Sequence, residues 1–166
     1  MSKNIKLGNF NQLAYSYRVS RPGYSKNIIN FIKSLPYKNP KKITTLDLGS
    51  GTGIFTKEIA KISHQVVGVE LSKEMIANSH KIKNVTYKNI SVDKLKINKK
   101  FDIFSAASCF HWFDNYKVAN LVKRSLNQNG YFLICYNSRN ISKNSFLKKV
   151  EKKIISLSKN FKSRVS

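Results

Sequence analysis

The sequence Leu46-Asp47-Leu48-Gly49-Ser50-Gly51-Thr52-Gly53 lies between two segments with different apolar patterns. A short apolar run with β-branched residues (43–45) precedes it, and apolar residues at helical spacing (54–62) follow it. The pattern predicts a strand, a tight glycine turn and then a helix. Glycines in such a turn adopt backbone angles closed to other residues and let a ligand approach the main chain. The free N–H groups at the start of the helix offer further hydrogen-bond donors.

The spacing of the glycines separates two kinds of nucleotide-type ligand. A dinucleotide fingerprint requires glycine or alanine at the last position of G-x-G-x-x-G, and here that position is Ile54. The glycines instead alternate, with Asp47 two residues ahead of Gly49, which resembles the acidic-x-G-x-G-x-G motif of class I S-adenosylmethionine (SAM)-dependent methyltransferases. The resemblance implies that the turn lies against the methionine part of SAM, with Asp47 near its amino group. A turn that only closes a strand–helix unit is the alternative.

The next predicted strand, 65–70, ends in the carboxylate of Glu70. This residue follows the first glycine by roughly 20 residues, where an acidic side chain can accept hydrogen bonds from both ribose hydroxyls. Ser72 is the expected N-cap of a helix from Lys73 to about Lys81. With the resemblance, these features predict the following cofactor-binding residues: Asp47, Gly49, Ser50, Gly51, Gly53, Glu70, Leu71, Ser91, Val92 and Ala106.

An Arg-Pro-Gly-Tyr turn lies near the start of the chain, where Tyr17, Arg21, Pro22 and Tyr24 form a Tyr-x-x-x-Arg-Pro-x-Tyr arrangement. It resembles the N-terminal element of trans-aconitate methyltransferase-like proteins, which implies a segment that folds over SAM and the acceptor. Arginines beside tyrosines can hold an anionic acceptor through charge-assisted bonds. Surface arginines next to a hydrophobic staple are the alternative. The predicted substrate-binding residues are Tyr17, Arg18, Arg21 and Trp112.

A strand predicted at 101–107 runs into Phe110-His111-Trp112-Phe113-Asp114, which resembles the same subgroup. In open α/β sheets, ligands bind at the carboxyl ends of the strands. His111 is therefore the candidate catalytic residue, able to orient an acceptor or remove a proton; a packed histidine that caps the strand is the alternative. The chain has Ala-Ser-Cys-Phe at 107–110 where amino-methylases of DNA carry an Asp/Asn-Pro-Pro-aromatic motif, which argues against base N-methylation.

Length and composition predict one domain over residues 1–166, with a core at about 10–136 and a basic amphipathic helix at about 145–161. The chain has no apolar run long enough to span a membrane and no secretion signal, so no membrane partner and a cytoplasmic location are expected. Cys109 and Cys135 are far apart without metal-ligand spacing, and no metal site is expected.

The charge is strongly positive, with 31 basic residues, 8 acidic residues and a formal net charge of +23. Only five of the basic residues are arginine, and the lysines are scattered among many asparagines and isoleucines. This mixture is what an AT-rich coding sequence yields, and dispersed lysines are mostly solvated. The pattern favours a compositional origin over a nucleic-acid surface. An RNA-binding protein or RNA methylase is the alternative that the charge suggests.

The predicted fold is α/β and Rossmann-like, with a parallel sheet in the order 3-2-1-4-5 and helices on both faces. The usual strands 6 and 7 have no sequence to form them, so the resemblance covers about 10–136 and indicates a C-terminally truncated enzyme. The strand at 131–136 is then an open edge where a partner chain could pair. The expected function is SAM-dependent methylation of a small molecule, with a carboxylate as the candidate acceptor. A SAM-binding remnant, or half of a split enzyme without independent activity, is the alternative.

Overall fold

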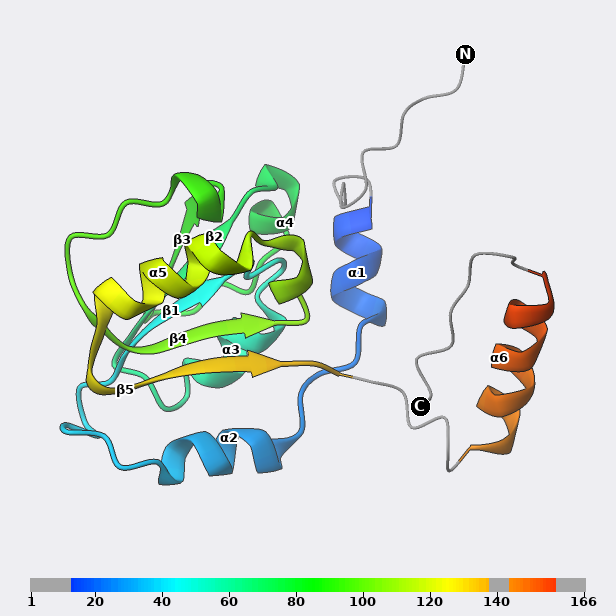
Figure 1. Cartoon of the computed structure of the whole chain (residues 1–166), viewed down its shortest axis with the longest axis horizontal. Helices are drawn as coiled ribbons and strands as arrows, with labels where there is room; N and C mark the ends of the chain where they lie inside the picture. The colour runs from blue at the N-terminus through cyan, green and yellow to red at the C-terminus, as the bar shows by residue number, and fades with distance from the viewer. Residues whose placement is uncertain (1–12, 138–143, 158–166) are drawn as a thin grey trace, which may run out of the picture. The chain divides into compact units, whose positions relative to one another are not determined.

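Five parallel strands form one sheet in the order β3-β2-β1-β4-β5 (Figure 1). The computed structural model describes residues 13–137 and 144–157. The strands are β1 (Thr44–Leu48), β2 (Gln65–Glu70), β3 (Val85–Asn89), β4 (Phe101–Ala107) and β5 (Leu126–Cys135). The helices are α1 (Ala14–Ser20), α2 (Lys26–Ser34), α3 (Ile54–Ile59), α4 (Lys73–Ala77), α5 (Asn115–Ser125) and α6 (Ser145–Leu157), with short 3-10 turns η2 (Val92–Lys94) and η3 (Phe110–Trp112). The predicted strand order is confirmed.

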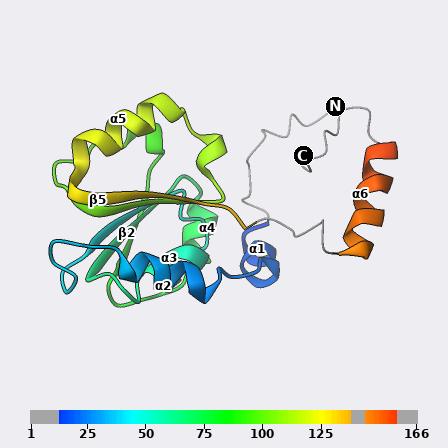
Figure 2. The same ribbon diagram turned by 60° about the horizontal axis from the view of Figure 1, so that its bottom comes forward.

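Helices cover both faces of the sheet, as Figure 2 shows with α5 on one side and α2 and α3 on the other. Successive side chains of a strand point to opposite faces. Leu48 and Phe104 therefore pack with Val118 of α5 in one buried cluster, while Ile103 and Ile59 belong to a second cluster with α2 and α3. Burial on both faces explains why the strands read as continuous apolar runs in the sequence.

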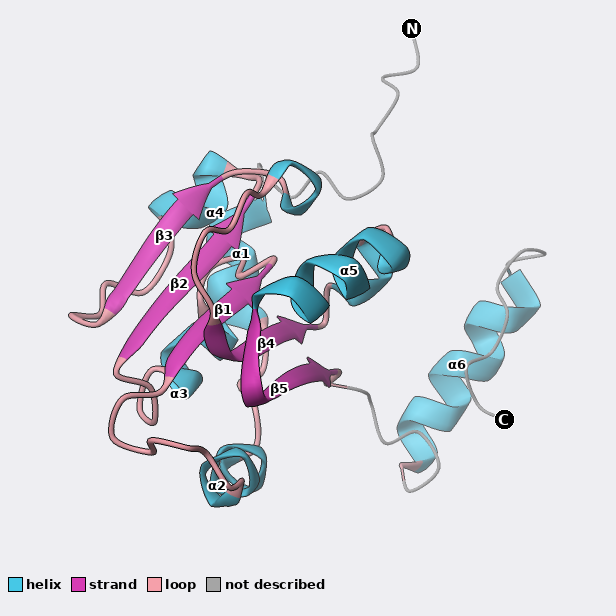
Figure 3. Cartoon of the chain, turned by 60° about the vertical axis from the view of Figure 1, so that its left-hand side comes forward, coloured by secondary structure: helices cyan, strands magenta, loops and turns pink. Residues whose placement is uncertain are grey.

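The carboxyl ends of the strands share one edge of the sheet, because all five strands are parallel (Figure 3). The turns that follow β1, β2 and β4 therefore meet at this end of the sheet. We call it the carboxyl end of the sheet, and we call the opposite end, where the strands begin, the amino end.

Side-chain caps fix where several helices begin. Ser25 accepts a hydrogen bond from the Asn27 N–H at 3.2 Å, and Ser72 accepts one from the Met75 N–H at 3.1 Å, as the sequence predicts for Ser72. The end of α4 differs from the prediction, because the helix stops at Ala77 and not at about Lys81. The Asn78 side chain donates back to the Glu74 carbonyl at 2.8 Å, and a polar side chain that bonds the backbone in this way competes with helix continuation.

Strand β5 begins five residues earlier than predicted, at Leu126 and not at Tyr131. Leu126 pairs with Phe101 and Tyr131 with Ile103, so residues 127–130 form a bulge opposite a single residue of β4. In this bulge the Asn127 amide donates to the Asp102 carboxylate at 2.7 Å. Residue 130, a glycine, thus lies in the bulge and does not cap α5. Of the strands that the structure describes, only β4 pairs with β5.

The chain divides into two compact units, residues 1–136 and 137–166. The first contains the sheet, and residues 10–12 of the predicted core lie outside the described residues. The second contains α6, which begins at Ser145; residues 158–161 of the helix predicted at about 145–161 lie outside the described residues. None of the described helices is long and apolar enough to cross a bilayer.

Candidate cofactor site

The glycine turn after β1 contains three residues with positive φ, namely Gly49 (63°), Gly51 (55°) and Gly53 (78°). A Cβ at Gly49 would lie 2.9 Å from the Cys109 sulfur, and one at Gly53 would overlap the Tyr87 hydroxyl. A Cβ at Gly51 would meet no atom within 4 Å. The outer two glycines are therefore required by close packing, whereas Gly51 borders open space where a ligand can approach the backbone.

The Glu70 carboxylate at the end of β2 is held beside this turn. One oxygen accepts a hydrogen bond from the Gly51 N–H at 2.9 Å, and the other accepts one from the Ser72 N–H at 2.9 Å. The main chain adds a third link, because the Ser50 N–H donates to the Val69 carbonyl at 3.0 Å. Each carboxylate oxygen keeps a further lone pair. Glu70 can therefore accept hydrogen bonds from a ligand without releasing the turn.

Asp47 lies behind the turn and not on its surface, with a side chain that is only 1% exposed. Its two oxygens accept hydrogen bonds from the hydroxyls of Thr56 at 2.6 Å and Ser105 at 2.7 Å. Burial raises the pKa of Asp47 to about 6; the two hydroxyl bonds oppose this shift and the charge of Glu70 adds to it. Asp47 thus ties β1 to α3 and β4. That Asp47 lies near the amino group of SAM, as the resemblance implies, stays a prediction.

The residues after β4 close over the end of β1. Ser108 has a φ of 58°, a conformation that costs energy for a residue with a side chain and clusters at functional sites. Its N–H donates to the Cys135 carbonyl at 2.7 Å, and its hydroxyl shares a hydrogen bond with the Tyr24 hydroxyl at 3.0 Å. Next to it, the Cys109 thiol donates to the Leu48 carbonyl at 3.0 Å, and burial raises the pKa of this thiol.

Tyr24, Ser108 and Cys109 were not among the predicted site residues. Tyr24 belongs to the Arg-Pro-Gly-Tyr turn, and the other two residues follow directly after a strand. The turn motif and the end of the strand could therefore have identified all three residues from the sequence. Burial raises the pKa of Tyr24 to about 12, its hydrogen bond to Ser108 opposing the shift. Tyr24 also packs edge-on against Phe55 of α3, with ring centroids 4.9 Å apart.

The remaining predicted cofactor residues divide between surface and core. Leu71 is 71% exposed beside Glu70, and Ser91 is partly exposed where η2 begins. Val92 is 9% exposed and packs in the core cluster under α5. Ala106 is fully buried within β4. Leu71 and Ser91 therefore border the carboxyl end, whereas the buried side chains of Val92 and Ala106 are core residues and offer a ligand little surface.

The predicted acceptor residues of the N-terminal segment lie on α1 and at its end. Helix α1 lies beside α4 in Figure 1 and contacts it. The Arg21 guanidinium is 5.2 Å from the centre of the Tyr17 ring. The pKa of His80 is lowered by burial first and then by nearby cations that include Arg18. Because the His80 N–H donates to the Thr52 carbonyl at 3.3 Å, this segment borders the glycine turn.

His111 and Trp112 are both exposed on η3, next to the carboxyl end of β4. The His111 ring lies 4.8 Å from the Trp112 ring and 5.9 Å from the Tyr136 ring, measured between centroids. This packing is compatible with a role in orienting an acceptor and with a purely structural role. Among residues 13–137 and 144–157, no group of three His, Cys, Asp or Glu side chains could hold a metal ion.

The model of the methyltransferase domain family matches residues 46–134, which is more than half of the chain and includes the glycine turn, Glu70 and β4. The chain belongs to this family. Its members are class I SAM-dependent methyltransferases, and the order of the five strands found here matches their Rossmann-like fold. The more specific trans-aconitate subgroup stays a prediction.

Three known proteins illustrate how far the similarity extends. A protein of Dictyostelium discoideum that is named as a methyltransferase is 30% identical over 126 residues, which are 75% of this chain and 47% of that protein. The malonyl-[acyl-carrier protein] O-methyltransferase of Bacillus cereus is 27% identical over 124 residues, 69% of this chain and 45% of its own length. The solved complex of the plantazolicin methyltransferase BpumL with SAH has a TM-score of 0.58 at 18% identity, covering 82% of this chain and 50% of that one. The chain thus spans about half the length of the curated relatives it matches.

Proposed function

We propose that this methyltransferase chain binds SAM at the glycine turn and transfers the methyl group to a small molecule. The observation that carries the proposal is the pairing of Gly51 with Glu70. The backbone at Gly51 is open to a ligand, and the carboxylate beside it is fixed by two main-chain N–H groups. A fixed carboxylate at the end of the second strand suits the two hydroxyls of a ribose. The family match and the SAH complex of the plantazolicin enzyme support the same cofactor.

SAM, when bound, supplies an activated methyl group on a sulfonium. The residues of this chain would bind and orient the two reactants, because an in-line displacement depends mainly on proximity and alignment. Glu70 would accept hydrogen bonds from the ribose hydroxyls, and Gly51 would let the ligand reach the backbone. Asp47 would act as a positioning residue, since it holds the turn from behind through Thr56 and Ser105.

A carboxylate is the acceptor class that we propose. A carboxylate is already ionised near neutral pH and needs no general base, which agrees with the exposed position of His111 beside the Trp112 ring. Arg18 and Arg21 are exposed cations on and next to α1, and Arg18 lies close enough to His80 to shift its pKa. Guanidinium groups bind carboxylates through paired, charge-assisted hydrogen bonds. The name of the Bacillus cereus relative also describes methylation at oxygen on a malonyl substrate.

The first test is calorimetric titration of the purified chain with SAM and, separately, with NAD. We expect micromolar binding of SAM and no response to NAD. Glu70→Gln should weaken SAM binding by about tenfold or more, because a hydrogen bond to a charged group contributes roughly 1.5–3 kcal/mol. Glu74→Gln is the matched control, since this exposed carboxylate lies on α4 outside the turn. A folded sample that does not bind SAM would contradict the proposal.

The acceptor class is tested by incubating the chain with methyl-labelled SAM and a panel of small carboxylates, amines and alcohols. We expect transfer to at least one of the carboxylates, with a raised KM and a similar kcat in Arg18→Gln if this arginine binds the acceptor. Transfer only to amines or to hydroxyls would exclude the carboxylate. SAM binding without transfer to any acceptor would identify the chain as a SAM-binding remnant.

We propose as a second candidate that the activity requires another strand on the β5 edge. Only β4 pairs with β5 among the described strands, while Ile134 is 43% exposed and Tyr136, just beyond β5, is 49% exposed. An unpaired apolar edge strand favours pairing with another chain. Light scattering of the wild-type chain should then show association that Ile134→Lys reduces. A monomeric wild-type chain that binds SAM and methylates an acceptor would exclude this candidate.

A further inference from the structure

The lysines that look dispersed in the sequence are concentrated immediately before the strands. The six residues before each strand, taken in order from β1 to β5, are 38–43, 59–64, 79–84, 95–100 and 120–125. These segments contain eleven lysine or arginine residues and no aspartate or glutamate. We call this set of five segments the basic end.

The segments that follow the strands are electrically balanced. The six residues after each of β1 to β4 contain two lysines, Lys73 and Lys94, and two acids, Glu74 and Asp93. Because all strands are parallel, every preceding segment lies at the amino end of the sheet and every following segment at the carboxyl end. The topology therefore converts a repeated sequence feature into a separation of charge. A uniform lysine excess from base composition would not distinguish the two ends.

The cations of the basic end are available to a partner. All eleven side chains belong to exposed residues. Among the residues that the structure describes, Lys61 is the member of this set found in an ion pair, with Glu58. The carboxylate of Asp102, which lies nearby at the start of β4, is engaged by Thr44 and Asn127.

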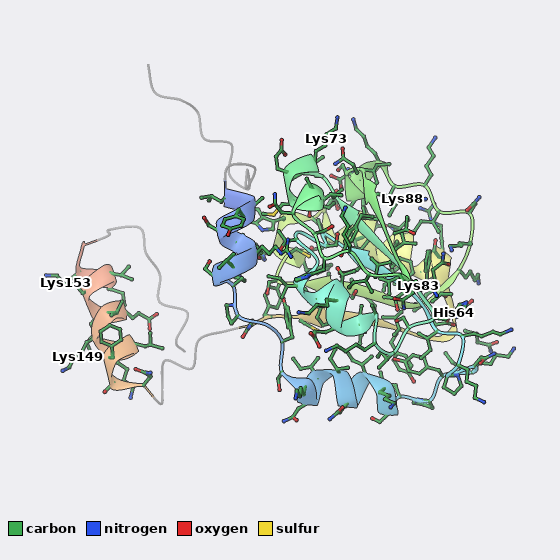
Figure 4. All side chains as sticks on the ribbon, turned by 180° about the vertical axis from the view of Figure 1, so that it is seen from behind. His64, Lys73, Lys83, Lys88, Lys149 and Lys153 are labelled. Carbon is green, nitrogen blue, oxygen red and sulfur yellow. The ribbon has the colours of Figure 1, made fainter. Side chains whose placement is uncertain are left out.

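A hollow at the basic end is large enough to take part of a ligand. It has a volume of about 520 Å³ and is lined by His64, Gln65, Lys83, Asn84 and Thr86. Figure 4 shows Lys83 and His64 close together, away from Lys73. The lining offers a cation, a histidine and neutral hydrogen-bonding groups, which is a suitable set for an anionic group.

We infer that the basic end binds the phosphate backbone of a nucleic acid, independently of the cofactor site. Clustered lysines attract the regularly spaced phosphates of a polynucleotide and release its counterions. None of the large exposed apolar side chains of the described residues lies in the five segments. Surfaces that insert into membranes present such side chains next to their lysines, so the observations favour a nucleic acid over a lipid surface. The inference goes beyond the proposed methyl transfer.

The test uses the full chain and a fluorescein-labelled RNA of 20 nucleotides, with binding followed by anisotropy between 50 and 300 mM KCl. The triple variant Lys42→Gln, Lys83→Gln, Lys100→Gln removes one cation before each of β1, β3 and β4. The control triple Lys73→Gln, Lys88→Gln, Lys94→Gln removes the same charge outside the basic end. Thermal melting and SAM titration of each variant show whether it is folded.

We expect the wild-type chain to bind the RNA with an affinity that falls steeply with salt. The basic-end triple should lose at least tenfold in affinity at 100 mM KCl, and its salt slope should fall by about 2, since each phosphate contact contributes roughly 0.7 for single strands. The control triple should lose less than threefold. Equal losses in both triples would mean that only net charge matters, and would overturn the inference. Equally tight, basic-end-dependent binding to phosphatidylserine vesicles would also overturn it, in favour of a membrane.

Discussion

The two ends of the sheet carry different kinds of residues. At the carboxyl end the chain places glycines, hydroxyls and carboxylates that are bound to one another, such as Glu70 on Gly51 and Asp47 on Thr56. At the amino end it places lysines that are exposed to solvent. The first arrangement depends on individual contacts, and the second depends on the sum of many charges. Single substitutions should therefore have large effects at the carboxyl end and small effects at the amino end.

The largest effect is expected for Gly53→Ala. A non-glycine residue with positive φ costs roughly 1–2 kcal/mol, and the added methyl group would overlap the Tyr87 hydroxyl. Overpacking of this kind costs a further 1–3 kcal/mol or so. We expect the free energy of unfolding to fall by about 2–5 kcal/mol, measured by urea denaturation.

Two other glycines are controls for this prediction. Gly51→Ala introduces the same strain without a close contact, so it should cost only about 1–2 kcal/mol while it impairs SAM binding. Gly23→Ala meets no atom within 4 Å and should leave both quantities unchanged. If Gly51→Ala destabilised the fold as strongly as Gly53→Ala, the distinction between packing glycines and a ligand-facing glycine would be wrong.

The next effect concerns the buried carboxylate of Asp47, whose pKa is raised to about 6 from its ordinary value of 3.8. A raised pKa means that the folded state binds the proton more tightly than the unfolded state, so stability falls as the pH rises from about 4 to 6. The loss can reach about 3 kcal/mol, at 1.36 kcal/mol per pKa unit. Urea denaturation at pH 4.5 and 7 should show this decrease in the wild-type chain. Asp47→Asn should remove most of it; an unchanged pH dependence in that variant would assign the decrease to another group.

The strand order and the glycine turn could be predicted because they depend on local patterns. Apolar runs with β-branched residues identify the strands, and alternating glycines after Asp47 identify the turn. Glu70 could be placed near the turn because it ends the next strand, roughly 20 residues after the first glycine. Its two main-chain hydrogen bonds agree with that placement.

The features that were missed depend on contacts between distant segments. The bulge in β5 is fixed by Asn127 on Asp102, 25 residues away, and the burial of Asp47 depends on Ser105 of β4. The positive φ of Ser108 depends on the closure of its loop over β1 and β5. The charge separation was also invisible along the sequence, because it appears only when parallel strands bring their preceding segments to one edge.

The smallest effect is expected at the basic end, where Lys100→Glu should stabilise the fold at low salt. The new carboxylate would face the neighbouring cations of the basic end, and exposed charge pairs contribute about 0.2–1 kcal/mol. Lys88→Glu is the matched control, since Lys88 is an exposed lysine of β3 that lies outside the basic end. Urea denaturation at 20 and 500 mM KCl should show a gain for Lys100→Glu alone, and the gain should vanish at high salt because screening shortens the reach of exposed charges. A similar gain in both variants would show that the repulsion is spread over the whole surface, and the contrast between the two ends would then not extend to stability.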